Sequence, residues 1–254
     1  MRQYESYKCP KCGNEVEVQN VGGGKLSCCG VEMECITQDL TAINLMKAFA
    51  GESMARNKYD LFADVAEEEG WHAVARHFRE AAENEKWHAR AEFKAYHEIV
   101  DGKPLEVTTK NLVTAAVREA AENEKWHARA EFKAYHEIVD GKPLEVTTKN
   151  LVTAAEGENY EHTTMYPNFA KIAEDEGKKA IARLFTAIGK VEIEHEREYL
   201  ALKKMLEEEE FFNSEVEELW VCEVCGHIHR GKKAPAACPL CKAPKEYFKR
   251  EFLG

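Results

Sequence analysis

The chain lacks any long hydrophobic run. No stretch of its 254 residues approaches the roughly 18–20 apolar residues that a membrane-spanning helix needs. The residues before Cys9 contain no apolar segment that resembles a signal peptide. We therefore expect a cytoplasmic protein. Hydrophobic residues make up 44% of the chain, which is enough to build a substantial core.

The chain also lacks an excess of positive charge and a nucleotide-binding motif. Its formal net charge of -11 argues against nucleic acid as a partner, because binding needs a basic face that displaces counterions. No glycine-rich dinucleotide motif occurs. A redox function would therefore need a separate protein to draw electrons from a nicotinamide cofactor.

Cysteine is missing from the whole middle of the chain, between Cys35 and Cys222. Apart from Cys35, which we expect to be a buried and inert thiol, the cysteines form one tetrad near each end. In each tetrad the cysteines occur in closely spaced pairs, which is the spacing of metal ligands. Because the expected compartment, the cytoplasm, is reducing, we predict metal thiolate sites rather than disulfides. The tetrads are Cys9, Cys12, Cys28 and Cys29, and Cys222, Cys225, Cys238 and Cys241.

The metal in each tetrad is left open by the residues alone. Zinc and iron both fit the four thiolates of the C-terminal tetrad. The N-terminal tetrad contains the adjacent pair Cys28 and Cys29, which requires an unusual local backbone. A structural zinc site remains an alternative there.

The motif Glu-x-x-His occurs in a matched frame at Glu85 and His88 and at Glu192 and His195. Residues three apart share one face of a helix, so each motif directs a carboxylate and an imidazole to the same side. With 32% of residues charged, a single motif could be an ordinary solvent-exposed face. Two copies in the same frame favour a metal site.

Each Glu-x-x-His motif follows a helix that contains Gly-Glu and supplies one further carboxylate, Glu52 or Glu158. One Glu from each of two helices and one Glu-x-x-His from each of two others form the ligand set of a di-iron or di-manganese carboxylate bundle. The sequence therefore predicts a two-metal site inside a helical bundle.

An exact duplication complicates this site, because residues 79–116 recur without a difference as residues 118–155. The second copy carries its own pair, Glu124 and His127. Which copy supplies ligands is open, but the first copy follows the preceding helix directly and closes a local hairpin at little entropic cost, so we favour it. We expect the helix over residues 111–139 to dock outside the site or to be exchanged with a partner.

The hydrophobic pattern predicts a small β-rich unit followed by helices. The unit covers residues 1–36, and the helices cover residues 37–69, 71–100, 150–176 and 178–210. Pro167 should kink the third helix just after Glu161, because proline cannot donate a hydrogen bond. Residues 211–218 are interpreted as a linker to the second tetrad.

From about residue 37 to its end, the chain resembles rubrerythrin, in its Gly-Glu helices, its Glu-x-x-His motifs and its C-terminal tetrad. Residues 1–36 look like desulforedoxin, in Tyr-Lys-Cys-x-x-Cys-Gly, the Gly-Gly-Gly turn and Cys-Cys-Gly. The resemblance implies a mainly α protein: a ferritin-like four-helix bundle with an extra duplicated helix, flanked by two small β-rich four-cysteine metal domains. The expected domains are residues 1–36, residues 37–212 and residues 217–254.

The resemblance also implies roles for individual residues. The residue His88 is similar to the family histidine that exchanges with a glutamate, here Glu161, when the redox state changes. Tyr59 and Tyr166 match family tyrosines that hydrogen-bond ligand carboxylates. The implied iron ligands of the bundle are Glu52, Glu85, Glu158, Glu161, Glu192 and His195, and one further iron is expected in each four-cysteine site, with zinc as the alternative.

The function implied is a cytoplasmic peroxide reductase that receives electrons through the C-terminal tetrad. The N-terminal tetrad would be a second relay or a structural metal site. Expected partners are hydrogen peroxide, a separate NAD(P)H-dependent reductase or a rubredoxin as donor, and a second copy of the chain in a homodimer or larger homo-oligomer. A ferroxidase or iron-storage protein and a non-enzymatic electron-transfer module are the alternatives.

Overall fold

A computed structural model describes residues 1–100, 102, 146–208 and 210–251. Most of the second copy of the duplicated segment, including Glu124, His127 and the extra helix expected over residues 111–139, lies outside these residues. Within the described part of the chain, no helix combines the length and the apolar character needed to cross a membrane.

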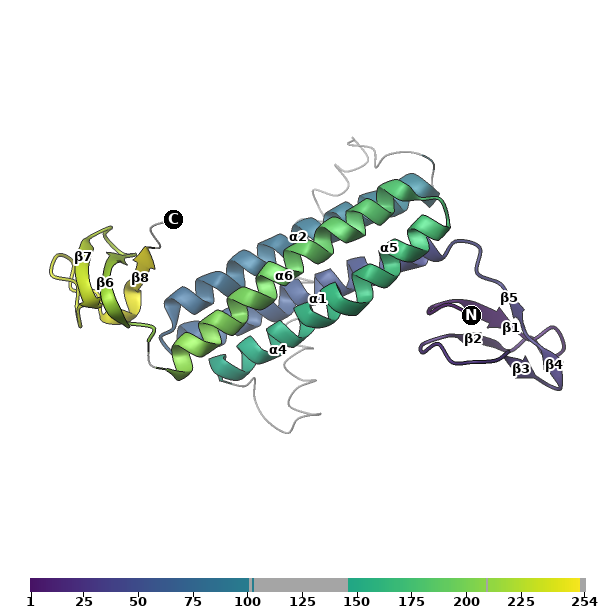
Figure 1. Ribbon diagram of the computed structural model, residues 1–254, viewed down its shortest axis with the longest axis horizontal. Helices are drawn as coiled ribbons and strands as arrows, with labels where there is room; N and C mark the ends of the chain where they lie inside the picture. The colour runs from purple at the N-terminus through teal and green to yellow at the C-terminus, as the bar shows by residue number, and fades with distance from the viewer. Residues whose placement is uncertain (101, 103–145, 209, 252–254) are drawn as a thin grey trace, which may run out of the picture.

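Long helices form the centre of the molecule, as the helical pattern predicted (Figure 1). They pack as two hairpins, α1 against α2 and the α4–α5 pair against α6, so that four helical columns surround two hydrophobic clusters. The fold is mainly α, and the prediction of a ferritin-like bundle flanked by two small β-rich units is confirmed. The bounds are α1 Leu40–Glu68, α2 His72–Val100, α4 Thr147–Tyr160, α5 Tyr166–Asp175 and α6 Lys179–Glu207.

Local residues explain where these helices begin and end. The Asp39 side chain caps α1 by accepting a hydrogen bond from the backbone N–H of Ala42 at 2.8 Å. Gly70 and Gly177 adopt φ angles of 83° and 77° where α1 and α5 end, a conformation that glycine allows at little cost. The two hairpins therefore use the same turn chemistry.

The third helical column is interrupted where the sequence predicts a disturbance. A π-helical segment, η2, spans Glu161–Met165 and joins α4 to α5. Pro167 lies in the first turn of α5, where its missing N–H costs little. The residues before it adopt the π-helical hydrogen-bond pattern instead of the α-helical one. The interruption begins at Glu161 itself.

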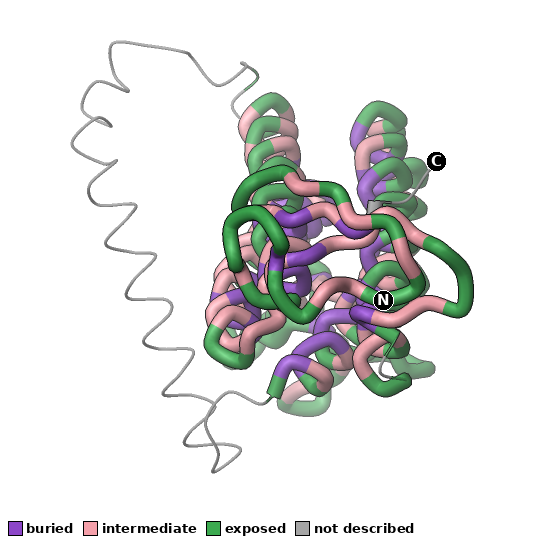
Figure 2. The backbone as a smooth tube through the Cα atoms, turned by 90° about the vertical axis from the view of Figure 1, so that its left-hand side faces the viewer, coloured by how far each residue is buried: buried purple, intermediate pink, exposed green. Residues whose placement is uncertain are grey.

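Aromatic residues fill the bundle core between the hairpins. Phe62 and Phe78 pack edge to face, with ring centroids 5.5 Å apart, and Tyr199 lies 5.4 Å from Phe78. Viewed along the bundle, buried residues face the space between the helices and exposed residues face outward (Figure 2). These rings belong to one hydrophobic cluster, which also contains Phe211 and Phe212.

The N-terminal unit is β-rich, as predicted, and lies at one end of the bundle (Figure 1). Its strands form a three-stranded sheet of order β2-β1-β5 and a separate β3-β4 hairpin. The expectation that Cys35 is buried is wrong: it lies on the two-residue edge strand β5, where one side has no neighbouring strand, and it is exposed. The bounds are β1 Ser6–Lys8, β2 Glu15–Glu17, β3 Ser27–Cys28, β4 Val31–Glu32 and β5 Glu34–Cys35.

The C-terminal unit lies at the opposite end of the bundle and forms a sheet of order β7-β6-β8 (Figure 1). Residues 211–218 are not a linker. Phe211 and Phe212 are buried against Trp71 of the bundle, and β6 begins directly after them. The bounds are β6 Asn213–Cys222, β7 Ile228–Lys233, the short 3-10 helix η3 Lys245–Tyr247, and β8 Phe248–Glu251.

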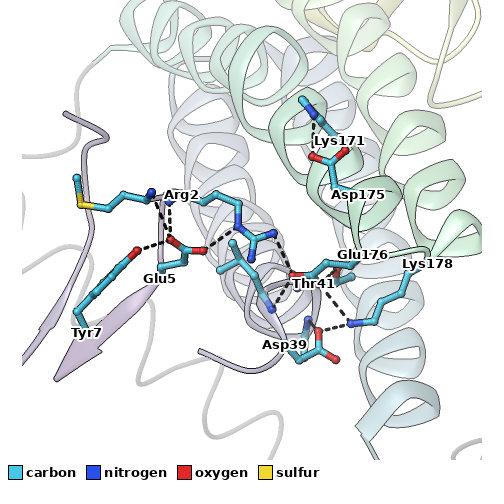
Figure 3. Close-up of polar contacts among 12 residues, drawn as sticks. Arg2, Glu5, Tyr7, Asp39, Thr41, Lys171, Asp175, Glu176 and Lys178 are labelled. Atoms are coloured by element: carbon cyan, nitrogen blue, oxygen red, sulfur yellow. Dashed lines mark hydrogen bonds and ion pairs between the residues drawn. The ribbon is translucent and has the colours of Figure 1, made fainter. Parts of the chain in front are cut away.

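The N-terminal unit and the bundle share one carboxylate, Glu176 (Figure 3). Its Oε2 accepts hydrogen bonds from the backbone N–H of Thr41 at 3.0 Å and from the Thr41 hydroxyl at 2.7 Å. Its Oε1 accepts from the backbone N–H of Leu40 and from Arg2, both at 3.3 Å. Glu176 thus caps α1 from the end of α5 and ties Arg2 to the same point.

We expect Glu176→Ala to lower the free energy of unfolding by about 1–2 kcal/mol, because three donors at the start of α1 lose their acceptor. Urea unfolding followed by helical circular dichroism measures the change. Asp175→Ala is the matched control: Asp175 is exposed and pairs only with the exposed Lys171 in Figure 3, so it should cost no more than about 0.5 kcal/mol. Equal costs for the two variants would contradict the capping role.

Candidate metal centres

The N-terminal tetrad comes together in space. The Sγ atoms of Cys9, Cys12, Cys28 and Cys29 all lie within 4.8 Å of one another, with Cys12 and Cys28 at 3.6 Å and Cys28 and Cys29 at 3.8 Å. Four thiolates about 2.3 Å from a central ion would be roughly 3.8 Å apart, so the spacing fits a tetrahedral metal. Cys29 has a φ of 53°, the unusual backbone that adjacent ligands were predicted to need.

The C-terminal tetrad has the same geometry on an unrelated turn pair. The Sγ atoms of Cys222 and Cys241 lie 3.6 Å apart, as do those of Cys225 and Cys238. Although burial opposes the change, backbone N–H groups of Cys241 and Leu240 lower the pKa of Cys238 to about 6. A thiolate is the form that binds a metal, so the turn prepares this ligand.

The centre of the bundle holds two overlapping groups of potential ligands. Each group draws one carboxylate from a Gly-Glu helix and shares Glu85 of α2 and Glu192 of α6 with the other group. Because the two groups share a pair of carboxylates, two neighbouring ions could be bridged by them. The groups are Glu52, Glu85, His88 and Glu192, and Glu85, Glu158, Glu192 and His195.

Both imidazoles present Nδ1 to the shared carboxylates. The Nδ1 atom of His88 lies 2.9 Å from Glu85 Oε2 and 3.0 Å from Glu192 Oε1. That of His195 lies 2.6 Å from Glu192 Oε2 and 3.3 Å from Glu85 Oε1. The Nε2 atom of His195 faces outward, 3.3 Å from the side-chain amide of Asn84. The opposite nitrogen is thus oriented from outside, as is usual for metal-ligating histidines.

Burial makes these carboxylates costly unless positive charge accompanies them. Burial raises the pKa of Glu52 to about 8, against the hydrogen bond to His88, which lowers it, and the charges of Glu85 and Glu192 add to the rise. Burial also opposes ionisation of Glu85, but hydrogen bonds to His195 and His88 lower its pKa to about 2. The same carboxylates overcome burial and raise the pKa of His195 to about 11. A cluster of this kind is stable only with protons or cations among its oxygens.

The lone pairs of the cluster are oriented for metal ions rather than for protein donors. Among the described residues, both oxygens of Glu192, Oε2 of Glu52, Oε1 of Glu85 and Nδ1 of His195 are buried without a well-directed hydrogen bond. Buried polar atoms are normally satisfied, so several orphans in one place point to a missing ligand. The residues present therefore fit a pair of metal ions.

Two buried tyrosines orient the outer carboxylates. The Tyr59 hydroxyl donates to Glu158, and the Tyr166 hydroxyl donates to Glu52. Each tyrosine comes from the hairpin opposite to the carboxylate that it contacts, because Tyr59 is on α1 and Tyr166 is on α5. The pairing crosses between the hairpins and holds the two halves of the site in register.

Glu161 lies near the cluster but belongs to neither group of four. It is the first residue of the π-helical segment. Burial first, and then the carboxylates of Glu52 and Glu158, raise its pKa to about 10. Its role as a ligand therefore stays a prediction.

The sequence reasoning missed one buried carboxylate at this site, Glu92. It lies on α2, is 0% exposed and contacts Tyr166, with 3.0 Å between Glu92 Oε1 and the tyrosine hydroxyl. It lies outside the Glu-x-x-His motif, but it follows Glu85 by two helical turns on the same face. That spacing is the signal that could have found it.

Within the described residues, the first copy of the duplication supplies Glu85 and His88 to the cluster. The alternative pair, Glu124 and His127, lies outside the described residues. The preference for the first copy is thus consistent with the structure and stays a prediction.

Comparison with known families accounts for nearly the whole chain. The model of the rubrerythrin family matches residues 44–118 and 111–203. That of the rubrerythrin rubredoxin-like domain matches residues 220–249, and that of the desulfoferrodoxin N-terminal domain matches residues 1–36. The matches cover the bundle and both cysteine tetrads.

Individual relatives agree with these matches. Rubrerythrin-1 of Clostridium acetobutylicum is 40% identical over 85% of this chain and 96% of the relative, and rubrerythrin of Porphyromonas gingivalis is 41% identical over 82% and 88%. A solved structure of nigerythrin in a partially reduced state aligns with a TM-score of 0.49 and 27% identity, covering 83% of this chain and 86% of that one.

The bundle holds a carboxylate and histidine di-iron site, and a four-cysteine site lies at each terminus. The chain belongs to the rubrerythrin family.

Proposed function

We propose that this protein reduces hydrogen peroxide to water at the centre of the bundle, with electrons relayed through iron in the four-cysteine sites. The reaction is H₂O₂ + 2 e⁻ + 2 H⁺ → 2 H₂O. The observation that carries the proposal is the pair of ligand groups sharing Glu85 and Glu192, in one chain with two four-cysteine sites. When bound, two ferrous ions together supply the two electrons that cleavage of the oxygen–oxygen bond needs.

The proposed ligands divide between two iron positions. One position lies among Glu52, Glu85, His88 and Glu192, and the other lies among Glu85, Glu158, Glu192 and His195. The Tyr59 and Tyr166 hydroxyls hold Glu158 and Glu52 in place from outside. Such contacts fix ligand geometry and usually change metal affinity or activity by about 10–100-fold when removed.

Glu161 is proposed to exchange with His88 as a ligand when the site changes redox state. It occupies the position that corresponds to Ala55 in the other hairpin, so it breaks the pseudo-twofold symmetry of the ligands. The π-helical segment that begins at Glu161 supports this role, because its backbone departs from the regular α-helix. The exchange would give the oxidised site one more carboxylate.

We expect Glu161→Ala to keep bundle iron, held by the remaining carboxylates, His195 and His88, while peroxide turnover falls by about tenfold or more. Iron per chain and the steady-state rate are measured together. Glu156→Ala is the matched control, because Glu156 is exposed on α4 and should change neither quantity. Unchanged turnover in Glu161→Ala would show that no ligand exchange occurs.

Electrons are proposed to enter through the C-terminal domain of a partner subunit. Within one chain this domain contacts the start of α2, where the Tyr247 ring stacks on His72 at 4.0 Å and Glu223 pairs with Arg76. At about 1.5 Å per residue, His72 lies roughly 20 Å along the helix from Glu85, which is far for direct electron transfer. A homodimer in which each C-terminal domain serves the other bundle would shorten this path.

The electrons would come from a separate NAD(P)H-dependent reductase or a rubredoxin in the cytoplasm. Steady-state peroxide consumption with such a donor tests the function. Loss of peroxide with water as product supports the proposal. Iron mineral inside large assemblies would favour iron storage, and a bundle that purifies without iron would favour an electron-transfer module.

A further inference from the structure

Glu92 is a fully buried carboxylate that the proposed reaction leaves without a role. Its exposure is 0%, and its Oε2 atom has no hydrogen-bond partner among the described residues. Carboxylates are almost never fully buried unless they are paired or protonated. Burial is the largest factor that raises the pKa of Glu92, and the charge of Glu52 is the next.

The Tyr166 hydroxyl lies between Glu92 and the ligand carboxylate Glu52. It contacts Glu52 Oε1 and is 3.0 Å from Glu92 Oε1. A phenolic hydroxyl has one proton, so it can donate to only one of these two oxygens. Glu52 binds metal as an ionised carboxylate and takes that donation. The second contact is a hydrogen bond only if Glu92 carries its own proton and donates it to the Tyr166 oxygen.

The groups around Glu92 agree with a neutral acid. Glu52 faces it from α1, Tyr166 from α5 and Glu192 from α6, and His88 lies on its own helix. The two carboxylates disfavour a further negative charge, whereas His88 favours it. His88 is already shared by Glu85 and Glu192 at 2.9 and 3.0 Å, so its charge is engaged elsewhere.

The other half of the site lacks this arrangement. Glu92 follows Glu85 by the same spacing at which Tyr199 follows Glu192. Tyr199 is buried with its ring 5.5 Å from that of Tyr59, the tyrosine that holds Glu158. Both outer carboxylates therefore receive a tyrosine hydroxyl. Among the described residues, only the Glu52 side has a carboxyl group in contact with the far side of its tyrosine hydroxyl.

We propose that Glu92 stores a proton as a neutral carboxylic acid and delivers it through the Tyr166 hydroxyl to the Glu52 side of the di-iron site. The role, but not the neutral state, rests on the proposed peroxide reduction. The O–H bond of Glu92 breaks as its proton binds Tyr166 Oη, while the original Tyr166 proton passes to Glu52 Oε1. No electron moves in this step. Two-electron cleavage of hydrogen peroxide yields two hydroxide equivalents, which need two protons. Glu52 passes the proton on its Oε1 to one of them, which becomes water, and Glu52 is again ionised. Glu92 is left ionised and takes up one proton from solvent before the next turnover.

Infrared spectroscopy of the iron-loaded protein tests the neutral acid directly. We expect the difference spectrum between the wild type and Glu92→Gln at neutral pH to contain the C=O stretch of a protonated carboxyl group. Other buried acids, such as Glu161, contribute equally to both proteins and cancel in the difference. Glutamine keeps an N–H donor toward Tyr166, so fold and iron content should be retained. The matched control is Glu131→Gln, which alters the identical sequence context in the second copy and should keep the band. A difference spectrum between the wild type and Glu92→Gln that lacks this band would overturn the proposal.

The relay itself is tested by the rate at which the reduced protein reacts with peroxide. We expect Glu92→Gln to react on the order of 10²-fold more slowly, with a rate that falls as pH rises, because the proton must now come from solvent. Tyr166→Phe should keep the infrared band, shifted by loss of the hydrogen bond, and show the same kinetic defect. An unchanged rate and pH profile in Glu92→Gln would overturn the relay. A wild-type protein that shows the band but does not reduce peroxide would overturn the proposed function and leave the neutral Glu92 standing.

Discussion

Cys238→Ser should reduce steady-state peroxide turnover to background, the largest effect we expect from one substitution. Cys238 is fully buried in the C-terminal tetrad, and its sulfur lies 3.6 Å from that of Cys225. Serine is a poor ligand for a thiolate site, and a small domain of this kind needs its metal to fold. The absorption of the C-terminal iron should disappear together with turnover.

Two further measurements separate loss of the relay from loss of the enzyme. Chemically reduced Cys238→Ser protein should still react with peroxide in a single turnover, because the bundle site is separate from the tetrad. Cys35→Ser is the matched control, since Cys35 is exposed and lies outside both tetrads. If Cys238→Ser keeps its steady-state rate, electrons enter by another path and the proposed relay is wrong.

His88→Ala and Glu85→Ala should each lose bundle iron, whereas His127→Ala and Glu124→Ala should keep it. Glu85 is shared by both ligand groups, so its loss should affect both iron positions. Breaking a buried charge cluster by removing one partner typically costs about 3–5 kcal/mol, so Glu85→Ala should also lower the stability of the bundle. Iron per chain, measured after reconstitution, gives the result.

The identical sequences of residues 79–116 and 118–155 make these variants natural controls for one another. Each pair places the same substitution in the same local sequence, so any difference arises from position in the fold. If the second-copy variants lose iron and the first-copy variants keep it, the ligands are Glu124 and His127 instead.

The metal site of the bundle could be predicted because its ligands recur at the spacing of one helix face. Glu85 and His88 share a helix face, Glu192 and His195 repeat the pattern, and the structure brings all four together. The cap at Asp39 and the turn at Gly70 are formed by equally local residues, close to the predicted helix ends at residues 37 and 69. Such features depend on residues close in the sequence, which is why they could be predicted.

Other features depend on contacts that the sequence pattern does not contain. Glu92 is an ordinary acidic residue of a charged helix until Tyr166, from α5, is seen to contact it. Phe211 and Phe212 follow an acidic run and suggested a linker, but Trp71 at the start of the second column buries them. Cys35 was expected to be buried by its residue type, whereas its place on an edge strand exposes it.

The central claim is that this bundle reduces peroxide, and re-oxidation of the reduced protein tests it most directly. The iron-loaded chain is reduced without oxygen and mixed rapidly with either hydrogen peroxide or dioxygen, and the recovery of ferric absorption is followed. We expect peroxide to re-oxidise the protein much faster than dioxygen does, with water as the only product. Re-oxidation by dioxygen at an equal or higher rate, or peroxide that remains unconsumed, would contradict the proposed function.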